Sequence, residues 1–367
     1  MDSVSAARKK VLFLIPSLVG GGAERVFTIL LRHLDRQRFE PQVAVLDAEG
    51  IQSVDIPSDI VVHDLGAKRV RYGMPRLIRL IWKLRPDTII STLGHLNIAI
   101  AMFRRLLPAD VRVILREAII VSSLFPKEAK NYRLWNWLYR NSYKRADAVI
   151  CLSDSMVEDM VTNFGLPREK LVRIYNPVDV EKVRTDATRQ PDPYNGLGPH
   201  LVAAGRLTYQ KGFDVLLQAM PTVMAALPTA HLVILGEGEL RQSLEEQARS
   251  LKLSDAVSFP GFQKDPWSYV KHANAFVLPS RFEGMPNAMM EALALGTPVV
   301  ATNCPGAVAE IAAMTNEINM VPIEDPQALA AAIIRTCNAG RTHAAGTGES
   351  LGLFDVLRVV DEYSKLF

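Results

Sequence analysis

Short apolar runs alternate with segments of helical periodicity along the first half of the chain. The apolar runs predict buried strands at residues 10–17, 42–46, 88–91, 111–115 and 148–152. The segments between them predict amphipathic helices at residues 23–34, 74–83, 98–105 and 131–145. Strands that alternate with helices are typical of a parallel sheet, because each parallel connection must cross back over the sheet. We therefore expect a doubly wound α/β domain.

The same rhythm restarts after residues 186–199, which are rich in Pro, Asp and Gly and typical of a linker. Strands are predicted at residues 200–204, 231–235, 256–259, 275–279 and 298–301, with helices that start near residues 213 and 288. The stretch 353–367 is patterned as a further helix. A chain of 367 residues is long enough for two domains. The sequence thus predicts two doubly wound sheets, which bind ligands at the carboxyl ends of their strands.

Composition is that of a folded globular protein, with 49% hydrophobic and 22% charged residues. No apolar run reaches the roughly 18 residues that span a bilayer, and the polar start at residues 1–10 is unlike a secretory signal. We therefore expect a cytoplasmic protein. Cys151, Cys304 and Cys337 are too few and too scattered for a disulfide framework or a thiolate metal cluster.

Charge is distributed unevenly between the two halves. Residues 1–150 hold 24 Lys and Arg against 14 Asp and Glu, a net charge of +10, whereas the remainder holds 18 against 25, a net charge of −7. A basic half favours an anionic partner, which would be a lipid surface, a phosphorylated acceptor or nucleic acid. No helix-turn-helix, zinc or RNA-binding signature accompanies the charge, so nucleic acid is disfavoured.

A basic amphipathic segment in this half predicts contact with an anionic membrane. Arg76, Arg79 and Lys83 fall on one side of the predicted helix 74–83. Aromatic and basic residues are also interleaved between residues 125 and 145, a mixture that favours interfaces. The alternative is that the apolar face of the helix packs on the sheet and the charges are simply solvated.

Three glycines, Gly20, Gly21 and Gly22, lie between the first predicted strand and the first predicted helix. Backbone amides at a helix N-terminus stabilise anions, so a phosphate could be held there. The run lacks the Gly-x-Gly-x-x-Gly spacing of a dinucleotide site. The alternative is a tight turn without a ligand.

Charged residues also follow two strands of the second half. Arg206 and Lys211 lie in one loop, and two cations at this spacing could clamp a diphosphate, unless they are solvated surface side chains. Glu283 precedes a predicted helix and Glu291 lies inside it, where carboxylates suit the hydroxyls of a sugar and a ribose. A lone pair of glutamates is more often surface decoration, but Glu291 stands among apolar residues, where an unpaired carboxylate would be costly.

Together these motifs resemble the retaining glycosyltransferases of family 4, whose mark is two glutamates separated by seven residues. The resemblance covers nearly the whole chain and is carried, in the order of the family, by residues 16–25, 205–213, 236–238, 279–284 and 291–300. It implies the α/β GT-B fold, in which two Rossmann-like domains face a central cleft. The domains would span residues 1–185 and 196–350, with the C-terminal helix 353–367 packing back on the first domain.

The resemblance also implies roles for individual residues. Arg206 and Lys211 would neutralise the leaving diphosphate and Glu283 would contact the donor sugar, which makes these three the catalytic candidates. The donor would further contact Gly21, Gly22, Gly205, Gly236, Glu237, Gly284, Met285, Pro286, Asn287 and Glu291, the last through its ribose. No metal or other cofactor is expected, because the GT-B enzymes that this chain resembles need no catalytic metal. In agreement, no Asp-x-Asp follows a strand.

The chain departs from the family after the strand 111–115, where many members have a histidine and this sequence reads Arg116-Glu117-Ala118. His95 follows an earlier strand and could lie at the same site, although a lone histidine is more often structural. We therefore take His95, Arg116 and Glu117 as candidates for the acceptor side.

The expected reaction is transfer of a hexosyl group from a UDP- or GDP-sugar to a hydroxyl of a lipid-linked or cell-surface glycan precursor, with retention at the anomeric carbon. The enzyme would attach peripherally to the inner face of the membrane. A GT-B epimerase of nucleotide sugars and a non-catalytic sugar-nucleotide binder are alternatives. An NAD-dependent dehydrogenase is disfavoured by the missing dinucleotide fingerprint.

Overall fold

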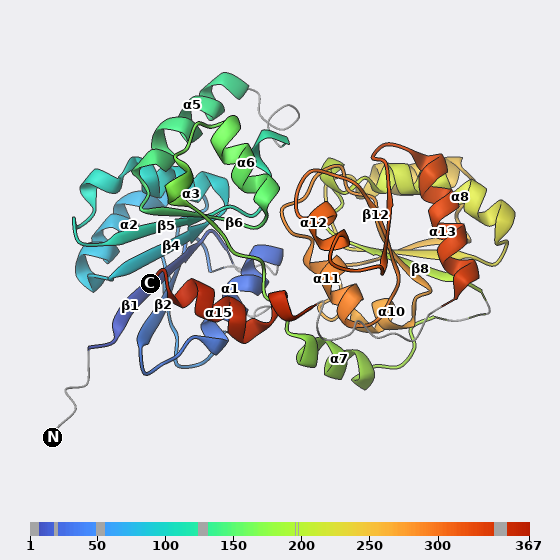
Figure 1. The fold of residues 1–367 in the computed structure, drawn as a ribbon, viewed down its shortest axis with the longest axis horizontal. Coiled ribbons are helices and arrows are strands. Elements are labelled where there is room, and N and C mark those ends of the chain that lie inside the picture. Colours follow the sequence, from blue (N-terminus) through green and yellow to red (C-terminus); the bar gives the residue numbers. More distant parts are fainter. Residues whose placement is uncertain are drawn as a thin grey trace. The chain divides into compact units, whose positions relative to one another are not determined.

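The computed structural model describes residues 7–17, 21–48, 56–123, 131–194, 196, 198–340 and 351–367. The chain forms two compact units, which Figure 1 colours along the sequence. The first unit comprises Met1–Pro177 together with Val356–Phe367, and the second comprises Val178–Asp355. Each unit is built on a parallel sheet of its own.

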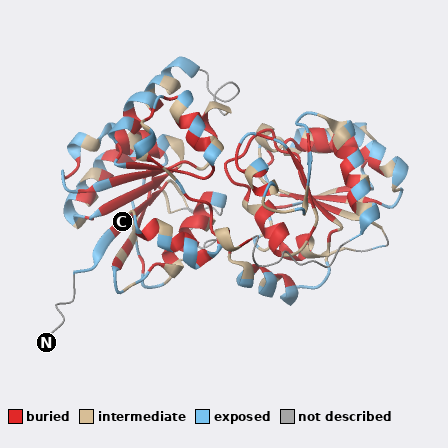
Figure 2. Cartoon of the chain, in the orientation of Figure 1, coloured by how far each residue is buried: buried red, intermediate tan, exposed pale blue. Residues whose placement is uncertain are grey.

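In the described part of the first unit, seven parallel strands follow the order β3-β2-β1-β4-β5-β6-β7. They are β1 Lys9–Ile15, β2 Phe39–Val45, β3 Val61–Asp64, β4 Thr88–Thr92, β5 Arg112–Arg116, β6 Ala148–Cys151 and β7 Leu171–Arg173. β4 and β6 are buried over their whole length, as expected of strands covered on both faces (Figure 2). The strand order reverses between β1 and β4, so the sheet is doubly wound, as the sequence pattern predicts.

Helices cover both faces of this sheet (Figure 1). They are α1 Gly22–His33, α2 Val70–Leu84, α3 Gly94–Met102, α5 Tyr132–Ser142, α6 Asp154–Thr162 and α15 Val356–Ser364, with 3-10 turns η2 Arg104–Leu106, η3 Tyr143–Arg145 and η4 Arg168–Lys170. α6 begins after Ser153, whose hydroxyl accepts a hydrogen bond from the Met156 amide at 3.1 Å. None of the described helices combines the length and the hydropathy needed to cross a bilayer.

The helix α15 is distant in sequence from the rest of the first unit and completes its core. Its buried apolar positions recur every three or four residues and so form one stripe against the sheet. Phe367, just beyond the helix, contacts Phe13 and Phe39 at ring-centroid distances of 6.0 and 5.8 Å. The Lys9 ammonium donates to the Phe367 carbonyl at 2.8 Å. α15 thus belongs to the first unit, although it follows the second unit in sequence.

The described part of the second unit holds six parallel strands in the order β10-β9-β8-β11-β12-β13. They are β8 His200–Ala204, β9 His231–Leu235, β10 Val257–Gly261, β11 Ala275–Leu278, β12 Val299–Thr302 and β13 Ile318–Val321. The helices are α7 Val180–Arg189, α8 Phe213–Ala226, α9 Arg241–Ser250, α10 Trp267–His272, α11 Asn287–Ala294, α12 Val308–Ala312 and α13 Pro326–Ala339, with 3-10 turns η5 Tyr209–Lys211 and η6 Gly352–Phe354. The order reverses between β8 and β11, so this sheet is doubly wound too.

The connection between the units differs from the expected one. The first residues of the predicted linker 186–199 are helical and belong to α7. The Arg184 guanidinium in this helix donates to the Ala294 carbonyl at the end of α11, at 2.8 Å. α7 therefore packs within the second unit, and the division between the units falls after Pro177.

Three strands, β3, β7 and β13, have no clear sequence signal. Each lies at an edge of its sheet, is three or four residues long and carries exposed or half-buried positions. An edge strand is covered less completely than a central one, so its sequence need not be a continuous apolar run.

Candidate active site

The candidate site lies where the sheet of the second unit reverses direction. Ligands of doubly wound sheets bind outside the carboxyl ends of the strands at such a point. The loop after β8 carries Arg206 and Lys211, and the loop after β11 carries Glu283. Since β8 and β11 are neighbours in the sheet, these two loops lie side by side.

Lys211 and Glu283 form an ion pair across the two loops. The Nζ atom of Lys211 lies 2.6 Å from Oε1 of Glu283, and the two side chains are only 17% and 5% exposed. Gly212, which follows Lys211, has a φ of +62°, and a Cβ atom there would lie 2.0 Å from the Pro279 carbonyl oxygen. Only glycine fits both that backbone conformation and that approach, so the turn that carries Lys211 is fixed against β11.

Further hydrogen bonds fix the Glu283 carboxylate. The Ser280 hydroxyl donates to Oε1 at 2.6 Å, and the Gln210 amide donates to Oε2 at 3.3 Å. The Glu283 backbone amide donates to the Pro305 carbonyl at 2.9 Å. Sequence reasoning missed Ser280 and Gln210, although Ser280 lies inside the motif that contains Glu283.

Glycines let the loops after β8 and β9 approach each other closely. A Cβ atom on Gly205 would lie 3.1 Å from Cε of Lys211, and one on Gly236, at a φ of +136°, would lie 2.0 Å from the Gly205 carbonyl oxygen. The predicted donor contact Glu237 faces solvent and pairs with Arg241 at 2.6 Å. Arg206 is exposed, and its side chain makes no hydrogen bond or ion pair with any residue that the structure describes.

The second glutamate of the pair, Glu291, lies on α11 and is 7% exposed. Its Oε2 accepts a hydrogen bond from the Trp267 indole at 2.8 Å, so a partner for this buried carboxylate is present within the chain. Sequence reasoning missed Trp267, because its place on α10 gives no sign that it faces α11.

The remaining donor candidates of the second unit surround the start of α11. Gly284, Met285 and Pro286 are buried, and Asn287 is the first residue of the helix. The Gly284 carbonyl accepts from the Ala307 amide at 2.8 Å, which ties this loop to the start of α12.

The predicted glycine turn of the first unit leads into α1. Gly21 is the N-cap residue of this helix and Gly22 is its first residue, whereas Gly20 lies outside the described residues. A Cβ atom on Gly21 would lie 2.4 Å from Oε2 of Glu24. The carboxylate of Glu24 thus lies against the turn where a phosphate was predicted.

Arg116 and Glu117 are each only 1% exposed. The Arg116 guanidinium donates to the Tyr363 hydroxyl at 3.0 Å, the Thr92 hydroxyl at 3.2 Å and the Asn176 side chain at 2.5 Å. Arg116 therefore links the end of β5 to α15 inside the first unit. Contact of either residue with an acceptor stays a prediction.

The Glu117 carboxylate is enclosed by polar side chains of the first unit. It accepts hydrogen bonds from the Asn97 amide at 3.0 Å and from the Tyr143 hydroxyl. Burial raises the pKa of Glu117 to about 7, against the opposing effect of these hydrogen bonds and of the Arg116 charge. His95 is exposed at the start of α3, where it packs edge-on against Trp135 at 4.8 Å.

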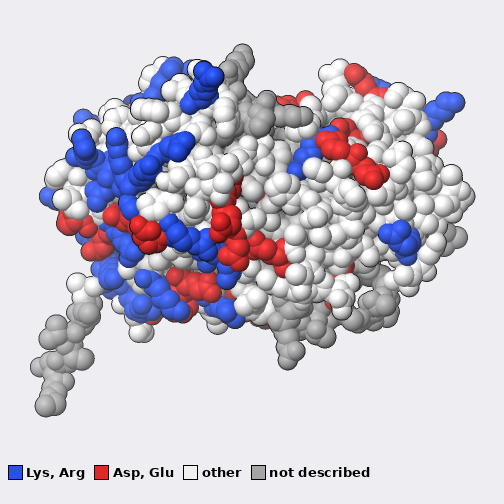
Figure 3. Space-filling view, turned by 45° about the horizontal axis from the view of Figure 1, so that its top comes forward, with Lys and Arg blue, Asp and Glu red and all other residues white. Residues whose placement is uncertain are grey.

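The predicted membrane residues lie on α2. Leu77 and Ile81 are buried, so the apolar face of this helix packs on the unit, whereas Arg76, Arg79 and Lys83 are exposed. Arg76 also donates to the carbonyls of residues 65 and 66 at 2.6 and 2.9 Å. Figure 3 shows Lys and Arg side chains gathered on the visible face of the first unit. The basic and aromatic segment 125–145 is described from residue 131 on, so Phe125, Lys127 and Lys130 lie outside the described residues.

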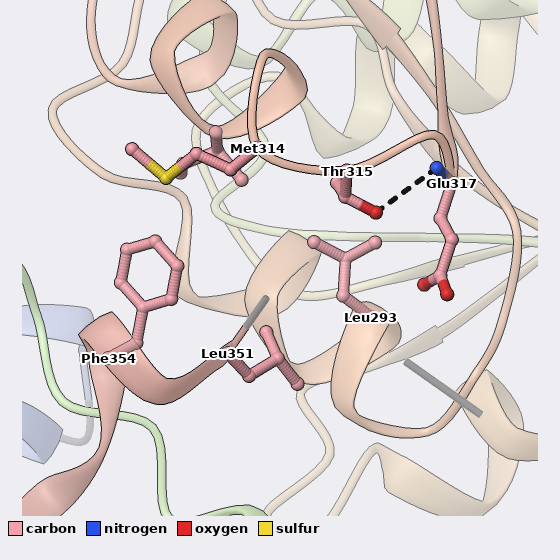
Figure 4. A pocket seen from close by; sticks show the side chains of 7 residues that line it. Leu293, Met314, Thr315, Glu317, Leu351 and Phe354 are labelled. Atoms are coloured by element: carbon pink, nitrogen blue, oxygen red, sulfur yellow. Dashed lines mark hydrogen bonds between the residues drawn. The ribbon is translucent and has the colours of Figure 1, made fainter. Parts of the chain in front are cut away.

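Figure 4 shows a small apolar hollow of the second unit, whose lining includes none of the candidate site residues. It is lined by Leu293, Ile311, Met314, Thr315, Glu317, Leu351 and Phe354. Glu317 immediately precedes β13, so the hollow lies near the amino ends of the strands, opposite the loops that carry Lys211 and Glu283. Its volume of about 10 Å³ is enough for about one water molecule, not for a sugar nucleotide.

Two protein-family models match the chain. The model described as Glycosyltransferase Family 4 matches residues 20–182, and the model described as Glycosyl transferases group 1 matches residues 198–339. The first match lies almost entirely within the first unit and the second match lies within the second unit.

Curated proteins with related sequences are glycosyltransferases. The lipopolysaccharide core biosynthesis glycosyltransferase LpsE of Rhizobium meliloti is 30% identical over 94% of this chain and 95% of its own length. The N-acetylgalactosamine-N,N'-diacetylbacillosaminyl-diphospho-undecaprenol 4-alpha-N-acetylgalactosaminyltransferase of Campylobacter jejuni is 28% identical over 80% of this chain and 81% of its own length. An uncharacterized glycosyltransferase of Methanocaldococcus jannaschii is 30% identical over 62% of this chain, and the match spans only 58% of that protein.

Solved structures share the fold. HepE of Anabaena, crystallised in complex with UDP-glucose, is 19% identical with a TM-score of 0.79, covering 97% of this chain and 98% of that one. Sucrose-phosphate synthase of Thermosynechococcus elongatus is 16% identical with a TM-score of 0.79, covering 98% of both chains. These likenesses establish the GT-B fold that the sequence motifs predict.

Proposed function

Because the chain belongs to glycosyltransferase family 4, we propose that it transfers a hexosyl group from a UDP- or GDP-sugar to a hydroxyl of a glycan precursor, with retention at the anomeric carbon. The observation that carries this proposal is the Lys211–Glu283 pair, a nearly buried cation and carboxylate at the reversal point of the second sheet. On donor binding, the Lys211 ammonium would exchange Glu283 for the anionic leaving group, and the Glu283 carboxylate would exchange Lys211 for a hydroxyl of the sugar.

In the proposed reaction the bond between the anomeric carbon and the diphosphate oxygen breaks, and the acceptor oxygen bonds to that carbon. The nucleoside diphosphate leaves with the electron pair and takes up the acceptor proton. Lys211 would turn from Glu283 to the departing phosphate, where a fixed cation stabilises developing charge. Glu283 would then accept a hydrogen bond from the donor sugar.

Arg206 and Glu291 would complete the donor site. The exposed Arg206 side chain would add a second positive charge on the diphosphate, and the two cations together would take the place of a metal ion. Glu291, oriented by the Trp267 indole, would accept hydrogen bonds from the ribose hydroxyls through its carboxylate.

The acceptor is proposed to be lipid-linked or part of a cell-surface polysaccharide. The name of the Campylobacter jejuni relative specifies a diphospho-undecaprenol acceptor, and the Rhizobium meliloti relative acts in lipopolysaccharide core biosynthesis. A lipid-linked acceptor would require the enzyme to work at a membrane, which we propose to be the cytoplasmic face.

Helices α2 and α3 and the turn η2 supply a surface suited to this contact. Trp82, Met102, Phe103 and Leu106 are 47%, 42%, 38% and 54% exposed, and we call them the apolar patch. The Trp82 indole donates to the Leu106 carbonyl at 2.8 Å, which holds two parts of the patch together. Exposed basic side chains on the same elements are Arg79, Lys83 and Arg105, and the exposed Arg85 directly follows α2. Apolar side chains among cations fit an anionic lipid surface.

Calorimetry and thermal shift with UDP, GDP, ADP, their common sugars and NAD test the proposal, with hydrolysis of each sugar nucleotide followed in parallel. We expect selective binding and slow hydrolysis of one sugar nucleotide, with a product of unchanged anomeric configuration by NMR and full activity in EDTA. Epimerised donor would instead favour an epimerase, and binding without turnover a sugar-nucleotide binder. Binding of NAD alone would contradict the proposal.

A further inference from the structure

Arg281 lies two residues before Glu283, and its side chain is only 8% exposed. Burial alone would lower the pKa of this guanidinium, but hydrogen bonds to Asp214 and Glu324 outweigh burial and raise the pKa well above its ordinary value. Arg281 is therefore a permanent positive charge set beside the candidate site. The proposed transfer leaves it without a role.

The Arg281 guanidinium contacts the segment that carries Lys211 on both sides of that lysine. On one side of Lys211, Nη1 donates to the Tyr209 carbonyl at 2.7 Å and the guanidinium stacks on the Tyr209 ring at 4.0 Å. On the other side, Nη1 and Nη2 donate to the two carboxylate oxygens of Asp214 at 2.9 and 2.7 Å. The Arg281 backbone amide also donates to the Gln210 carbonyl at 2.8 Å.

The same guanidinium reaches a third loop, which follows β13. Nε and Nη2 donate to the two carboxylate oxygens of Glu324 at 2.5 and 3.2 Å. Glu324 has a φ of +57°, a left-handed conformation that costs a non-glycine residue free energy. Arg281 thus joins the loops that follow β8, β11 and β13. These loops lie at the carboxyl ends of the strands, where the Lys211–Glu283 pair also lies.

We propose that Arg281 is a positioning residue, which holds the Lys211 turn at the distance from Glu283 that the transfer requires. The inference rests on the proposed function, because it assigns Lys211 to the leaving diphosphate. Lysine cannot replace Arg281, since one ammonium group cannot make two forked contacts with carboxylates and stack on a ring.

The partners of Arg281 make the idea testable without unfolding the unit. Asp214 and Glu324 are 36% and 48% exposed, so water can solvate them when the guanidinium is removed. We call the contacts of the Arg281 guanidinium with Tyr209, Asp214 and Glu324 the clamp. Asp214→Asn and Glu324→Gln each remove one carboxylate contact of the clamp, and Arg281→Gln removes the whole of it. Arg36→Gln is the matched control, because Arg36 likewise pairs with a carboxylate, Asp59, at 2.6 Å and donates to two backbone carbonyls, but in the first unit.

Steady-state kinetics with the sugar nucleotide provide the first readout. We expect Arg281→Gln to lower kcat roughly 10- to 100-fold, since a small misplacement of a catalytic cation has effects of this size. The kcat values of Arg281→Lys and of the two carboxylate variants are expected to lie between those of Arg281→Gln and the unchanged protein. The kcat of Arg36→Gln is expected to equal that of the unchanged protein. A loss of thermal stability in Arg281→Gln with normal kcat overturns the proposal.

A double-mutant cycle with Lys211→Ala shows whether Arg281 acts through Lys211. We expect Arg281→Gln to lower kcat further by less than about twofold once Lys211 is gone, because there is then no cation to position. The same fold loss in both backgrounds would mean that Arg281 acts independently of Lys211, and would overturn the proposal.

Hydrogen exchange of the backbone amides of residues 209–214 separates the clamp from the proposed function, because it needs no substrate. We expect faster exchange there in Arg281→Gln and unchanged exchange in Arg36→Gln. Unchanged exchange in both variants overturns the clamp, whatever the enzyme transfers. Faster exchange in a protein that neither binds nor cleaves any sugar nucleotide would retain the clamp and reject the transfer.

Discussion

Lys211 and Glu283 are 72 positions apart in sequence, yet their charged groups lie 2.6 Å from each other. The pair brings together the loops after β8 and β11, and both side chains are mostly shielded from water. Removing either partner leaves the other with an unpaired charge in a place where solvation is poor.

Lys211→Ala is expected to lower kcat for the sugar nucleotide roughly 100- to 1000-fold, the usual effect of deleting a group that stabilises developing charge. Glu283→Gln is expected to lower kcat as well, because it removes the carboxylate that would contact the donor sugar and leaves Lys211 without its ionic partner. Circular dichroism and thermal denaturation check that the fold persists. Lys365→Ala is the matched control, because Lys365 forms an ion pair with Asp361 at 2.7 Å but at 68% exposure in the first unit. Near-normal turnover in Lys211→Ala would remove that lysine from the site.

The raised pKa of Glu117 predicts how the stability of the first unit depends on pH. Its pKa rises from an ordinary 4.5 to about 7 on burial, so between these values the unfolded chain loses a proton that the native chain keeps. Stability therefore falls as pH rises from 4.5 to 7, by about 3 kcal/mol, and the fall stops above that window. Urea unfolding between pH 4 and 8 should show this slope, and Glu117→Gln should lack it. Parallel curves for the two proteins would contradict the prediction.

Tyr363→Phe is expected to destabilise the first unit by roughly 1.5 to 3 kcal/mol, because it removes a hydrogen bond to a buried guanidinium. The Tyr363 hydroxyl accepts from Arg116 at 3.0 Å, and both side chains are at most 1% exposed. Tyr194→Phe is the control, since the Tyr194 hydroxyl donates to the neutral Tyr269 carbonyl in the second unit. Denaturant unfolding measures both variants. Equal effects would show that the Arg116 contact has no special weight.

Charge reversal of Arg79 and Lys83 is expected to weaken binding to vesicles of phosphatidylglycerol and phosphatidylcholine at least about tenfold, since each cation near an anionic surface contributes about 1 kcal/mol. Trp82→Ala with Phe103→Ala tests the apolar patch, and vesicle flotation measures binding for all of these variants. Reversal of Arg249 and Lys264, exposed basic residues of the second unit, is the control. Binding that none of these changes affects would dispose of the membrane contact.

Elements buried on both sides were predictable, because their sequences carry the whole signal. β4 is buried at each of its five positions and reads as a strand without any knowledge of its neighbours. The half-exposed β3 does not, since its pairing with β2 is what makes it a strand. The end of α7, residues 186–189, lay in a predicted linker, because polar residues fill most of the exposed face of this helix and its packing on the second unit is a tertiary property.

At the site, sequence spacing placed Lys211 and Glu283 in loops at strand ends, but not in contact with each other. Trp267 and Arg281 were assigned no role, because their contacts with Glu291 and Asp214 join segments 24 and 67 positions apart. Arg116 looked like an available cation after a strand. The hydroxyl that it contacts comes from α15, 247 positions further on, and no local pattern announces that contact.

The place of α15 in the sequence has a consequence for synthesis on the ribosome. Residues 356–367 emerge only after the whole of residues 178–355, although their side chains fill the core of the first unit. Until then Phe13 and Phe39 lack the ring of Phe367, and Arg116 lacks the hydroxyl of Tyr363. The first unit can therefore complete its core only after every residue of the second unit has been synthesised.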